Sequence, residues 1–280
     1  MFFRYDLVFI QRFFLKAALI KILRARKTTV IFDFDDAIYL DAPGKHINFD
    51  KTKLVLSAAD HIIVSSPELY NFCRHEGYSK VSVITTPIDT GRYIPKQNPD
   101  NSTVTIGWIG SPYTSKFLEP LANVFAQISN NFKVKYLFVG GGNDFQAWNL
   151  PIENVAWSYD SETECIAKMD IGIMPLDHDN YSKGKGGYKL FQYMAGGIPV
   201  IASPVGINSE IVDHGRNGFL AGNDEEWIKY LTLLLENNSL RITMGNEGRN
   251  DALNKYSRQV CFEKLSEIIN REITWKLKNT

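Results

Sequence analysis

The segment from Gly184 to Gly206, GKGGYKLFQYMAGGIPVIASPVG, constrains the fold of this chain more than any other. A glycine turn leads into an amphipathic helix from about Tyr188 to Ala195, and a second glycine turn leads into a wholly apolar strand. Strands of this kind are buried on both faces, as in parallel sheets that are covered by helices. The segment therefore predicts half of a βαβ unit.

Apolar strands and amphipathic helices alternate along the rest of the chain in two series. The segment between the series, Ile88 to Ser102, is polar and rich in Pro, Gly and Asn, which is typical of a linker. Two alternating series joined by a linker predict an α/β protein with two Rossmann-like, doubly wound domains. We expect a first domain over residues 1–95 and a second domain over residues 103–257.

Composition narrows the classes of function. Lys+Arg and Asp+Glu both number 31 among the 280 residues, so the formal net charge is zero and a nucleic-acid partner is disfavoured. The three cysteines, Cys73, Cys165 and Cys261, are widely spaced without a metal-ligand pattern, which indicates a reduced, cytoplasmic protein. No apolar run reaches membrane-spanning length, and no signal-peptide cleavage pattern follows Met1.

A basic amphipathic helix is predicted from Phe13 to Lys27, after a short strand at Leu7–Gln11. Packing of its apolar face on a sheet is the favoured interpretation. Peripheral contact with a membrane surface is the alternative, and both can hold together if the protein acts on lipid-linked acceptors at the inner face of the membrane.

The start of the helix in the opening segment is a candidate anion site. Gly186 and Gly187 leave its first free N–H groups open to close approach by a ligand. Lys185 and Lys189 flank these groups, and the helix dipole adds positive potential at the same end. We predict that a phosphate or diphosphate binds here. An ordinary βαβ turn with two solvated lysines is the alternative.

From Gly184 to Gly206 the chain resembles the donor-site motif of the family 4 (group 1) glycosyltransferases, where a similar helix precedes a Pro-Val-Ile-Ala-Ser strand and a Gly turn. The resemblance implies the GT-B fold, a nucleotide diphosphate sugar as donor, and a glycan or lipid-linked hydroxyl as acceptor. It also implies retention of anomeric configuration, no cofactor and no obligatory metal. Lysines and helix N–H groups that stabilise the departing diphosphate would make the main catalytic contribution.

The loop after the apolar strand at Val104–Gly110 resembles the phosphate loop of the same family. The family's lysine falls on Lys116, whereas Ser111 occupies the place where an arginine is common. The resemblance therefore assigns Gly110, Ser111 and Lys116 to the donor site and leaves one phosphate charge unmatched. A solvated lysine is the alternative interpretation of Lys116.

The loop that begins at Asp177 is expected to hold the donor sugar and diphosphate. Family members have two glutamates here; Gln192 takes the place of the one that contacts the nucleotide ribose, and Gly184 replaces the one that contacts the sugar. Gln192 can still hydrogen-bond ribose hydroxyls. The resemblance implies that Asp177 or Asp179 reaches a sugar hydroxyl instead.

Glu210, at the start of a later helix, is the last donor-site residue that the resemblance implies. It follows the strand and Gly turn that close the opening segment. Capping of this helix by Asn208 or Ser209 is the structural alternative.

The stretch VIFDFDDAIYL, from Val30 to Leu40, ends an apolar strand with acidic residues. Asp35 and Asp36 occupy the place of a His-Asp pair in the family, so we predict them as catalytic residues that face the interdomain cleft and the acceptor. Turn capping by Asp36 is the structural alternative. A haloacid dehalogenase-like phosphatase is a weaker alternative, with Asp33 as nucleophile, Asp35 as acid/base and Mg²⁺ between them. Ala37 lies where that motif needs Thr or Val.

The GT-B resemblance also implies that a helix over residues 258–280 crosses back to the first domain. Its apolar stripe consists of Val260, Phe262, Leu265, Ile268 and Ile269. Burial of this stripe contributes about 1.5–3 kcal/mol for each large side chain that is fully covered.

The first domain is expected to be incomplete. A domain of this fold needs roughly 150 residues, and fewer than a hundred precede the linker. Because a leading strand is missing, the first sheet should end in an exposed edge at Leu7–Gln11. A truncated, non-catalytic protein that binds nucleotide sugar is therefore an alternative to the active glycosyltransferase.

Overall fold

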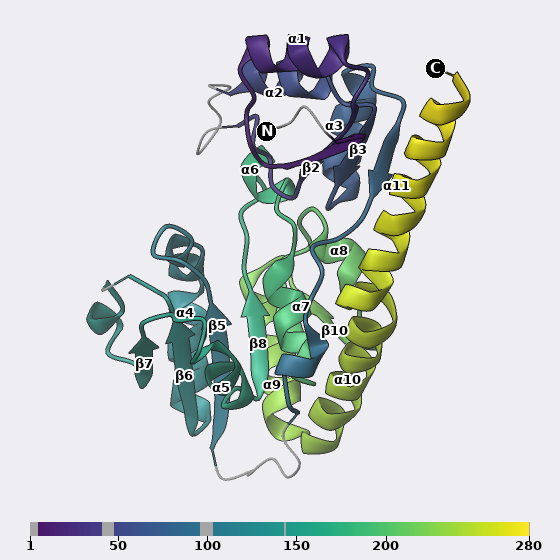
Figure 1. Ribbon diagram of the computed structural model, residues 1–280. Helices are drawn as coiled ribbons and strands as arrows, with labels where there is room; N and C mark the ends of the chain where they lie inside the picture. The colour runs from purple at the N-terminus through teal and green to yellow at the C-terminus, as the bar shows by residue number, and fades with distance from the viewer. Residues whose placement is uncertain (1–4, 41–47, 96–102, 143, 280) are drawn as a thin grey trace. The chain divides into compact units, whose positions relative to one another are not determined.

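The computed structural model describes residues 5–40, 48–95, 103–142 and 144–279 (Figure 1). The chain divides into two compact units. The first unit comprises residues 1–87, 178–186 and 259–280, and the second unit comprises residues 88–177 and 187–258. Each unit contains one parallel sheet, which confirms the predicted α/β class with two separate sheets.

The sheet of the first unit has the strand order β1-β2-β3-β4, and all neighbouring strands are parallel. Its strands are β1 (Leu7–Gln11), β2 (Thr29–Phe34), β3 (His61–Val64) and β4 (Val81–Val83). Its helices are α1 (Ala17–Ala25), α2 (Phe49–Leu56), α3 (Pro67–His75), α6 (Asn180–Lys183) and α11 (Arg258–Asn279). β1 lies at the edge and, among the described residues, pairs only with β2, so the expected edge strand is present.

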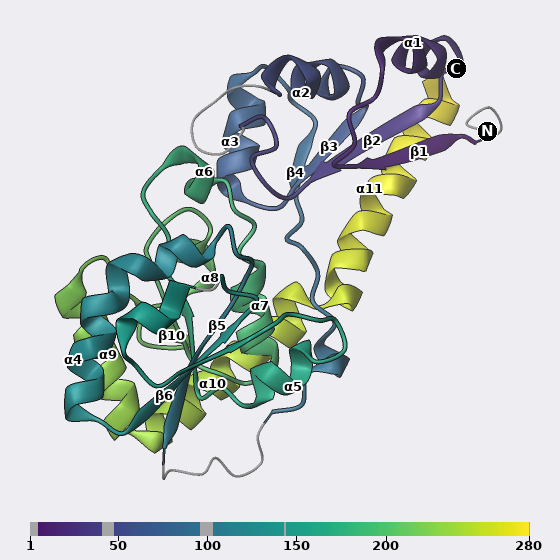
Figure 2. The same cartoon turned by 90° about the vertical axis from the view of Figure 1, so that its left-hand side faces the viewer.

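Alternate residues of β2 point to opposite faces of this sheet, as the pleat of a strand requires. Val30, Phe32 and Phe34 pack with buried residues of α1, α2 and α3. Ile31 packs instead with Ile63 of β3 and Ile268 of α11. Helices α1 to α3 therefore cover one face of the sheet and α11 covers the other (Figure 2). Packing of α1 on the sheet agrees with the favoured interpretation of that segment.

The sheet of the second unit has the strand order β10-β9-β8-β5-β6-β7 and is also parallel throughout. Its strands are β5 (Val104–Ile109), β6 (Val134–Val139), β7 (Ile152–Val155), β8 (Ile171–Met174), β9 (Val200–Ala202) and β10 (Gly218–Leu220). Its helices are α4 (Ala122–Asn131), α5 (Glu162–Ala167), α7 (Tyr188–Ala195), α8 (Asn208–Ile211), α9 (Asp224–Glu236) and α10 (Asn238–Asp251). Residues of α4 and α9 belong to one apolar core, and residues of α5 and α7 to another.

Two elements of the second unit differ from the sequence expectation. The helix expected from Lys116 begins as a 3₁₀ helix, Ser115–Leu121, and becomes α-helical only at Ala122. Pro120 lies in the 3₁₀ segment, where it has no N–H to donate to an α-helical hydrogen bond. The strand expected at Val155–Trp157 is β7, which ends at Val155.

The start of the expected linker is packed into the second unit. Ile88 and Tyr93 are fully buried in the core that contains α5 and α7. The Ile88 N–H donates to the Tyr256 carbonyl at 3.0 Å, and the Arg258 N–H donates to the Ile88 carbonyl at 3.1 Å. Polar composition suggested a solvated linker, but burial of these two apolar side chains attaches residues 88–95 to the core of the second unit. Residues 96–102 lie outside the described part of the chain.

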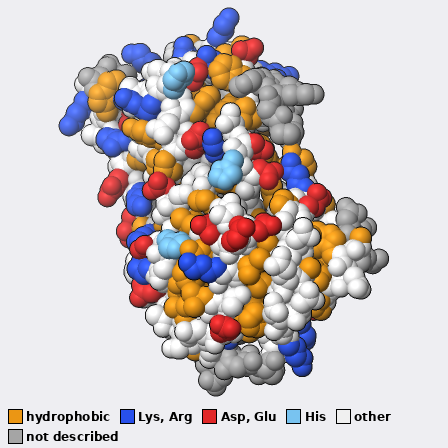
Figure 3. Space-filling view, turned by 180° about the vertical axis from the view of Figure 1, so that it is seen from behind, with side chains coloured by type: hydrophobic (Ala, Val, Ile, Leu, Met, Phe, Trp, Pro, Cys, Tyr) orange, Lys and Arg blue, Asp and Glu red, His pale blue; other side chains and the backbone are white. Residues whose placement is uncertain are grey.

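The surface agrees with the balanced composition. On the face drawn in Figure 3, acidic, basic and hydrophobic side chains are interspersed. None of the three cysteines forms a disulfide, and all are buried. Every helix in the described ranges is too short or too polar to span a membrane.

Helix α11 is attached to the first sheet by a buried polar cluster as well as by Ile268. The Glu272 carboxylate contacts His61 Nδ1 at 3.2 Å and Lys80 Nζ at 2.8 Å, and its side chain is only 4% exposed. Burial raises the pKa of Glu272, but the hydrogen bond and charge of Lys80, with His61 and Arg271, outweigh burial and lower it overall. Phe262, which the sequence placed in the buried stripe, is instead 64% exposed.

Replacing Glu272 with Gln should reduce stability at pH 7 by about 1–3 kcal/mol, because a charge-assisted hydrogen bond in a buried site becomes a neutral one. Since the pKa of Glu272 is lowered on folding, its contribution exists above its ordinary pKa and is lost as the pH falls below it. Urea unfolding followed by circular dichroism should therefore show a lower free energy of unfolding for Glu272→Gln than for the parent at pH 7. This difference should shrink as the pH is lowered towards 3.5. Glu267→Gln, an exposed site on the same helix, is the control. Equal curves for Glu272→Gln and the parent at pH 7 would contradict the anchoring role.

Candidate functional site

Two glycines, Gly110 and Gly140, lie in the second unit where the loops after β5 and β6 contact each other. Gly110 follows β5, and Gly140 follows β6 with a φ of +75°. A Cβ at Gly140 would lie 2.3 Å from the Gly110 carbonyl oxygen, which is backbone and cannot move aside. The loop after β6 therefore approaches the Gly110 carbonyl as closely as it does only because Gly140 lacks a side chain.

Lys189 reaches the same place from the first turn of α7. Its Nζ lies 4.3 Å from the centre of the Trp108 ring, a cation–π contact. A Cβ at Gly110 would lie 2.7 Å from this Nζ. Among the described residues, no side chain caps the start of α7. The structure thus brings the Lys189 ammonium to Gly110 from the first turn of a helix whose first N–H groups have no side-chain cap, and cations and free helix N–H groups are what an anion site requires.

Gly187, the residue before α7, has a φ of +72°, a conformation that favours glycine. A Cβ here would lie 2.6 Å from Ile211 Cδ1 and 3.0 Å from Ile207 Cγ2. The lack of a side chain is therefore explained by the backbone and by packing against the α8 segment. The predicted close approach of a ligand stays a prediction.

The loop after Gly110 is a hydrogen-bonded turn. The Ser111 N–H donates to Thr114 Oγ1 at 3.0 Å, and the Thr114 N–H donates to the Ser111 carbonyl at 2.9 Å. Lys116 follows this turn, with its Nζ 5.1 Å from the ring centres of both Tyr113 and Phe117. Ser111 is exposed and carries no charge, so Lys116 is the single cationic residue in the sequence of this loop, residues 110–116.

Trp157 is a residue that sequence reasoning missed as part of this site. It follows β7, is 50% exposed, and its Cβ would lie 3.1 Å from a Cβ at Gly140. Its Nε1 donates to Glu162 Oε2 at 2.9 Å, which fixes the plane of the indole. The only sequence signal was an aromatic residue after a short strand, which is too common to be specific.

Gln192 lies in the core rather than at the surface of the site. Its side chain is 3% exposed, and its Nε2 donates to the Tyr93 hydroxyl at 3.4 Å. The Tyr93 hydroxyl in turn donates to Glu162 Oε1 at 2.7 Å. These contacts give Gln192 a structural role between α7 and residues 88–95. The ribose contact that the resemblance implies stays a prediction, and the described contacts do not support it.

Asp177 and Glu210 are both exposed in the second unit. Asp177 follows β8, and Glu210 lies on α8. The alternative in which Asn208 or Ser209 caps α8 is wrong, because no side chain caps this helix and Asn208 is buried within it. Asn208 Nδ2 instead donates to the Ser203 carbonyl at 3.1 Å, which ties α8 to the end of β9.

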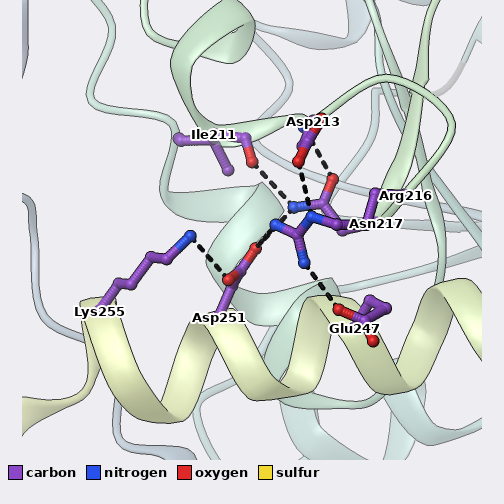
Figure 4. Close-up of polar contacts among 7 residues, drawn as sticks. All are labelled: Ile211, Asp213, Arg216, Asn217, Glu247, Asp251 and Lys255. Atoms are coloured by element: carbon purple, nitrogen blue, oxygen red, sulfur yellow. Dashed lines mark hydrogen bonds and ion pairs between the residues drawn. The ribbon is translucent and has the colours of Figure 1, made fainter.

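A polar cluster holds the end of α8 in place (Figure 4). Asn217 Nδ2 donates to the Ile211 carbonyl at 3.1 Å and to Asp251 Oδ2 of α10 at 2.9 Å. Arg216 bridges three carboxylates, those of Asp213, Glu247 and Asp251. Asp251 also pairs with Lys255 at 2.8 Å. The position of the exposed Glu210 on α8 therefore depends on a network that extends to α10.

In the first unit, the predicted Asp35 and Asp36 follow β2 and share one counter-ion. Arg12 Nη1 lies 3.0 Å from Asp35 Oδ1, and Arg12 Nη2 lies 3.3 Å from Asp36 Oδ2. Burial and the charge of Asp36 raise the pKa of Asp35, and Arg12 opposes this rise. Asp33 accepts a hydrogen bond from Gln11 Nε2 at 2.9 Å, and burial raises its pKa to about 6.

Lys185 and Gly186 also belong to the first unit, whereas Gly187 and Lys189 belong to the second. A Cβ at Gly186 would lie 2.8 Å from the Asp35 carbonyl oxygen, so this glycine permits the loop to pack beside the end of β2. Lys185 Nζ lies 4.4 Å from the centre of the Tyr181 ring. Both residues are thus placed by local packing within the first unit.

Metal-ligating side chains do not gather in the described ranges: no group of three or more His, Cys, Asp or Glu residues is arranged to hold an ion there. The expectation that no metal is obligatory therefore stays a prediction.

Two solved structures resemble the whole described fold. Sucrose-phosphate synthase from Thermosynechococcus elongatus matches with a TM-score of 0.77 and 17% identity, covering 95% of this chain and 73% of its own. HepE of Anabaena in complex with UDP matches with a TM-score of 0.76 and 16% identity, covering 95% and 79%. The fold is therefore of the GT-B glycosyltransferase class, as predicted.

Residues 103–237 match the family described as glycosyl transferases group 1. Over 151 residues the chain is 26% identical to N-acetyl-alpha-D-glucosaminyl L-malate synthase of Bacillus anthracis, an alignment that covers 50% of this chain and 38% of that protein. The resemblance to the group 1 glycosyltransferases is therefore confirmed, and the family's model matches residues 103–237 of this chain.

Replacing Gly140 with Ala should destabilise the second unit far more than replacing Gly215 with Ala. Both glycines have positive φ, +75° and +88°, so both variants incur the backbone penalty of roughly 1–2 kcal/mol. Only at Gly140 does the new Cβ collide with backbone, whereas nothing lies within 4 Å of a Cβ at Gly215. Thermal unfolding followed by circular dichroism compares the two variants. Equal melting temperatures would show that the two loops are not held in this close contact.

Proposed function

We propose that this protein is a glycosyltransferase that transfers a hexose-type sugar from a nucleotide diphosphate sugar to a hydroxyl acceptor, with retention of anomeric configuration, in glycan or surface-polysaccharide synthesis. One observation carries the proposal. Within the group 1 glycosyltransferase region, Lys189 in the first turn of α7 places its Nζ beside Gly110 at the carboxyl edge of a parallel sheet, and no described side chain caps the start of that helix. Ligands of doubly wound domains bind at this edge.

The solved neighbours support a nucleotide sugar as the ligand. HepE of Anabaena has been solved with UDP, with UDP and glucose, and with UDP-glucose. Those ligands belong to HepE, and we extend only their common chemistry, a nucleoside diphosphate, to this chain. The diphosphate needs N–H donors and cations, both of which lie at the start of α7.

Stabilisation of the leaving diphosphate would then be the main catalytic contribution. As the bond from the sugar to the phosphate breaks, negative charge grows on the diphosphate while the sugar becomes oxocarbenium-like. Lys189, Lys116 and the first N–H groups of α7 are the donors that we assign to this charge. No protein nucleophile is required in this scheme.

We assign the nucleotide base and the sugar of the donor to other residues of the second unit. The exposed face of Trp157 offers a stacking surface for the nucleotide base, since every base has a π-face. Asp177 and Glu210 are the exposed carboxylates that we assign to sugar hydroxyls. Gln192 is not included, because its amide is engaged in the core.

The acceptor is assigned to the first unit, through Asp35 and Asp36. A glycan or lipid-linked hydroxyl is the acceptor class that we propose, with Asp35 as the carboxylate that receives the hydroxyl proton. Peripheral membrane contact through the basic residues of α1 remains part of this proposal, at the inner face of the membrane.

Binding of a nucleotide sugar without turnover is the second candidate function. It is favoured by the small sheet of the first unit, four described strands with β1 at the edge. A thermal-shift screen of nucleotide sugars identifies the donor, since a bound ligand raises the melting temperature by mass action. Release of the free nucleoside diphosphate with a sugar acceptor supports the transferase. Stabilisation without release supports the binding protein, and no stabilisation by any nucleotide sugar refutes both.

Replacing Lys189 with Ala should weaken UDP binding by about 1.5–3 kcal/mol, the usual contribution of a hydrogen bond to a charged group. This corresponds to an increase in Kd of roughly 10- to 150-fold. Isothermal titration calorimetry measures it. Lys229→Ala is the matched control, because Lys229 lies on α9 of the same unit and, like Lys189, has its Nζ over an aromatic ring, that of Tyr230. An unchanged Kd in Lys189→Ala, with the fold intact, would rule out the assigned diphosphate site.

Transfer should continue in the presence of a chelator, because lysines and helix N–H groups take the place of a metal at the diphosphate. The rate of nucleoside diphosphate release is measured with and without excess EDTA. Loss of activity that Mg²⁺ or Mn²⁺ restores would overturn this part of the proposal.

A further inference from the structure

Arg12 lies after β1, whereas the two carboxylates that it contacts, those of Asp35 and Asp36, lie after β2. It directly follows β1, with a φ of +53°, which is uncommon for a residue other than glycine. Its N–H donates to the Asp33 carbonyl at 2.9 Å, which continues the pairing of β1 with β2 by one residue. Its side chain is thereby brought to the loop that follows β2.

The guanidinium of Arg12 contacts two neighbouring carboxylates, one with each terminal nitrogen. One nitrogen faces Asp35 at 3.0 Å, and the other faces Asp36 at 3.3 Å. The carboxylates of adjacent residues repel each other, and a planar fork with two separate donors can hold both in one geometry. A lysine has a single ammonium group and cannot reproduce the fork.

Arg12 is a counter-ion of the Asp35 carboxylate in the described structure, and the other groups around Asp35 act differently. From β2, Asp33 adds a further negative charge. From the end of β3, Ser65 donates to the Asp35 carbonyl at 2.7 Å rather than to its carboxylate. From residues 178–186, Gly186 packs on the same carbonyl, and Lys185 lies over Tyr181. Burial and Asp36 both raise the pKa of Asp35, whereas Arg12 lowers it.

We propose that Arg12 is a positioning residue for acceptor activation: its two ion pairs keep Asp35 ionised and fix the orientation of Asp35 and Asp36 toward the acceptor hydroxyl. This inference rests on the proposed function, in which Asp35 receives the hydroxyl proton. Arg12 itself touches neither donor nor acceptor in the proposal. Its effect should therefore appear in acceptor kinetics and in the acid limb of the pH profile, and not in donor binding.

The test compares Arg12→Ala and Arg12→Lys with the parent in the 280-residue chain. Arg12→Ala should lower kcat/KM for the acceptor by about tenfold or more, since misplacement of a reacting group is costly. It should also move the acid limb of the profile to higher pH, because Asp35 then protonates more easily. Arg12→Lys keeps the charge, so it should restore the position of the acid limb while kcat/KM stays reduced. Affinity for UDP by calorimetry should be unchanged in both variants.

Arg74→Ala is the control, because Arg74 is an exposed arginine of the same unit whose guanidinium donates to the carbonyls of Tyr78 and Ser79. An unshifted pH profile in Arg12→Ala, or no recovery of the acid limb in Arg12→Lys, would overturn the proposal. If no nucleotide sugar supports transfer at all, the proposed function fails, and Arg12 is then tested by NMR titration of the Asp35 carboxyl. A pKa that is equal in the parent and in Arg12→Ala would refute the role of Arg12 on its own.

Discussion

The close contact of two backbone loops, at Gly110 and Gly140, is the constraint on which the candidate site depends. Parallel strands β5 and β6 end side by side, and the loop after β6 can approach the Gly110 carbonyl only because Gly140 carries no Cβ. The absence of a Cβ at Gly110 leaves room for the Trp108 ring and for Lys189 Nζ. This approach leaves the Trp108 ring, and the Lys189 ammonium over it, at the edge where the helix dipole of α7 is positive. Positive potential from Lys189 and from the start of α7 therefore acts at the edge where two glycines lack side chains.

The order of strands and helices could be predicted because it depends on local patterns. The wholly apolar strands β8 and β9 and the amphipathic α7 are recognisable from periodicity alone. Ile88 and Tyr93 were not recognised as core residues, because two apolar side chains in a polar segment form no pattern. Their burial is decided by partners that lie far along the chain, such as Tyr256 and Glu162.

Residues of the candidate site could be proposed from the sequence only where the type of side chain and its place in an element suggest a function. Lys189 and Gly110 were found because a cation and a glycine near a helix start or a strand end suggest an anion site. Arg12 was missed because its importance comes from the register of β1 on β2, which pairs Gln11 with Asp33. Gln192 was assigned by its position in a motif, and its hydrogen bond to Tyr93 could not be foreseen.

The attachment of residues 88–95 to the second unit has a mechanical consequence. The chain leaves the first unit after Pro87 and returns to it after Arg258. At these points Ile88 is hydrogen-bonded to Tyr256 and Arg258, and Arg258 Nη1 pairs with Asp89 at 2.8 Å. Two of the covalent connections between the units are thus clamped to each other at their second-unit ends. Neither connection can therefore detach from the second unit at this point without breaking the hydrogen bonds that it shares with the other.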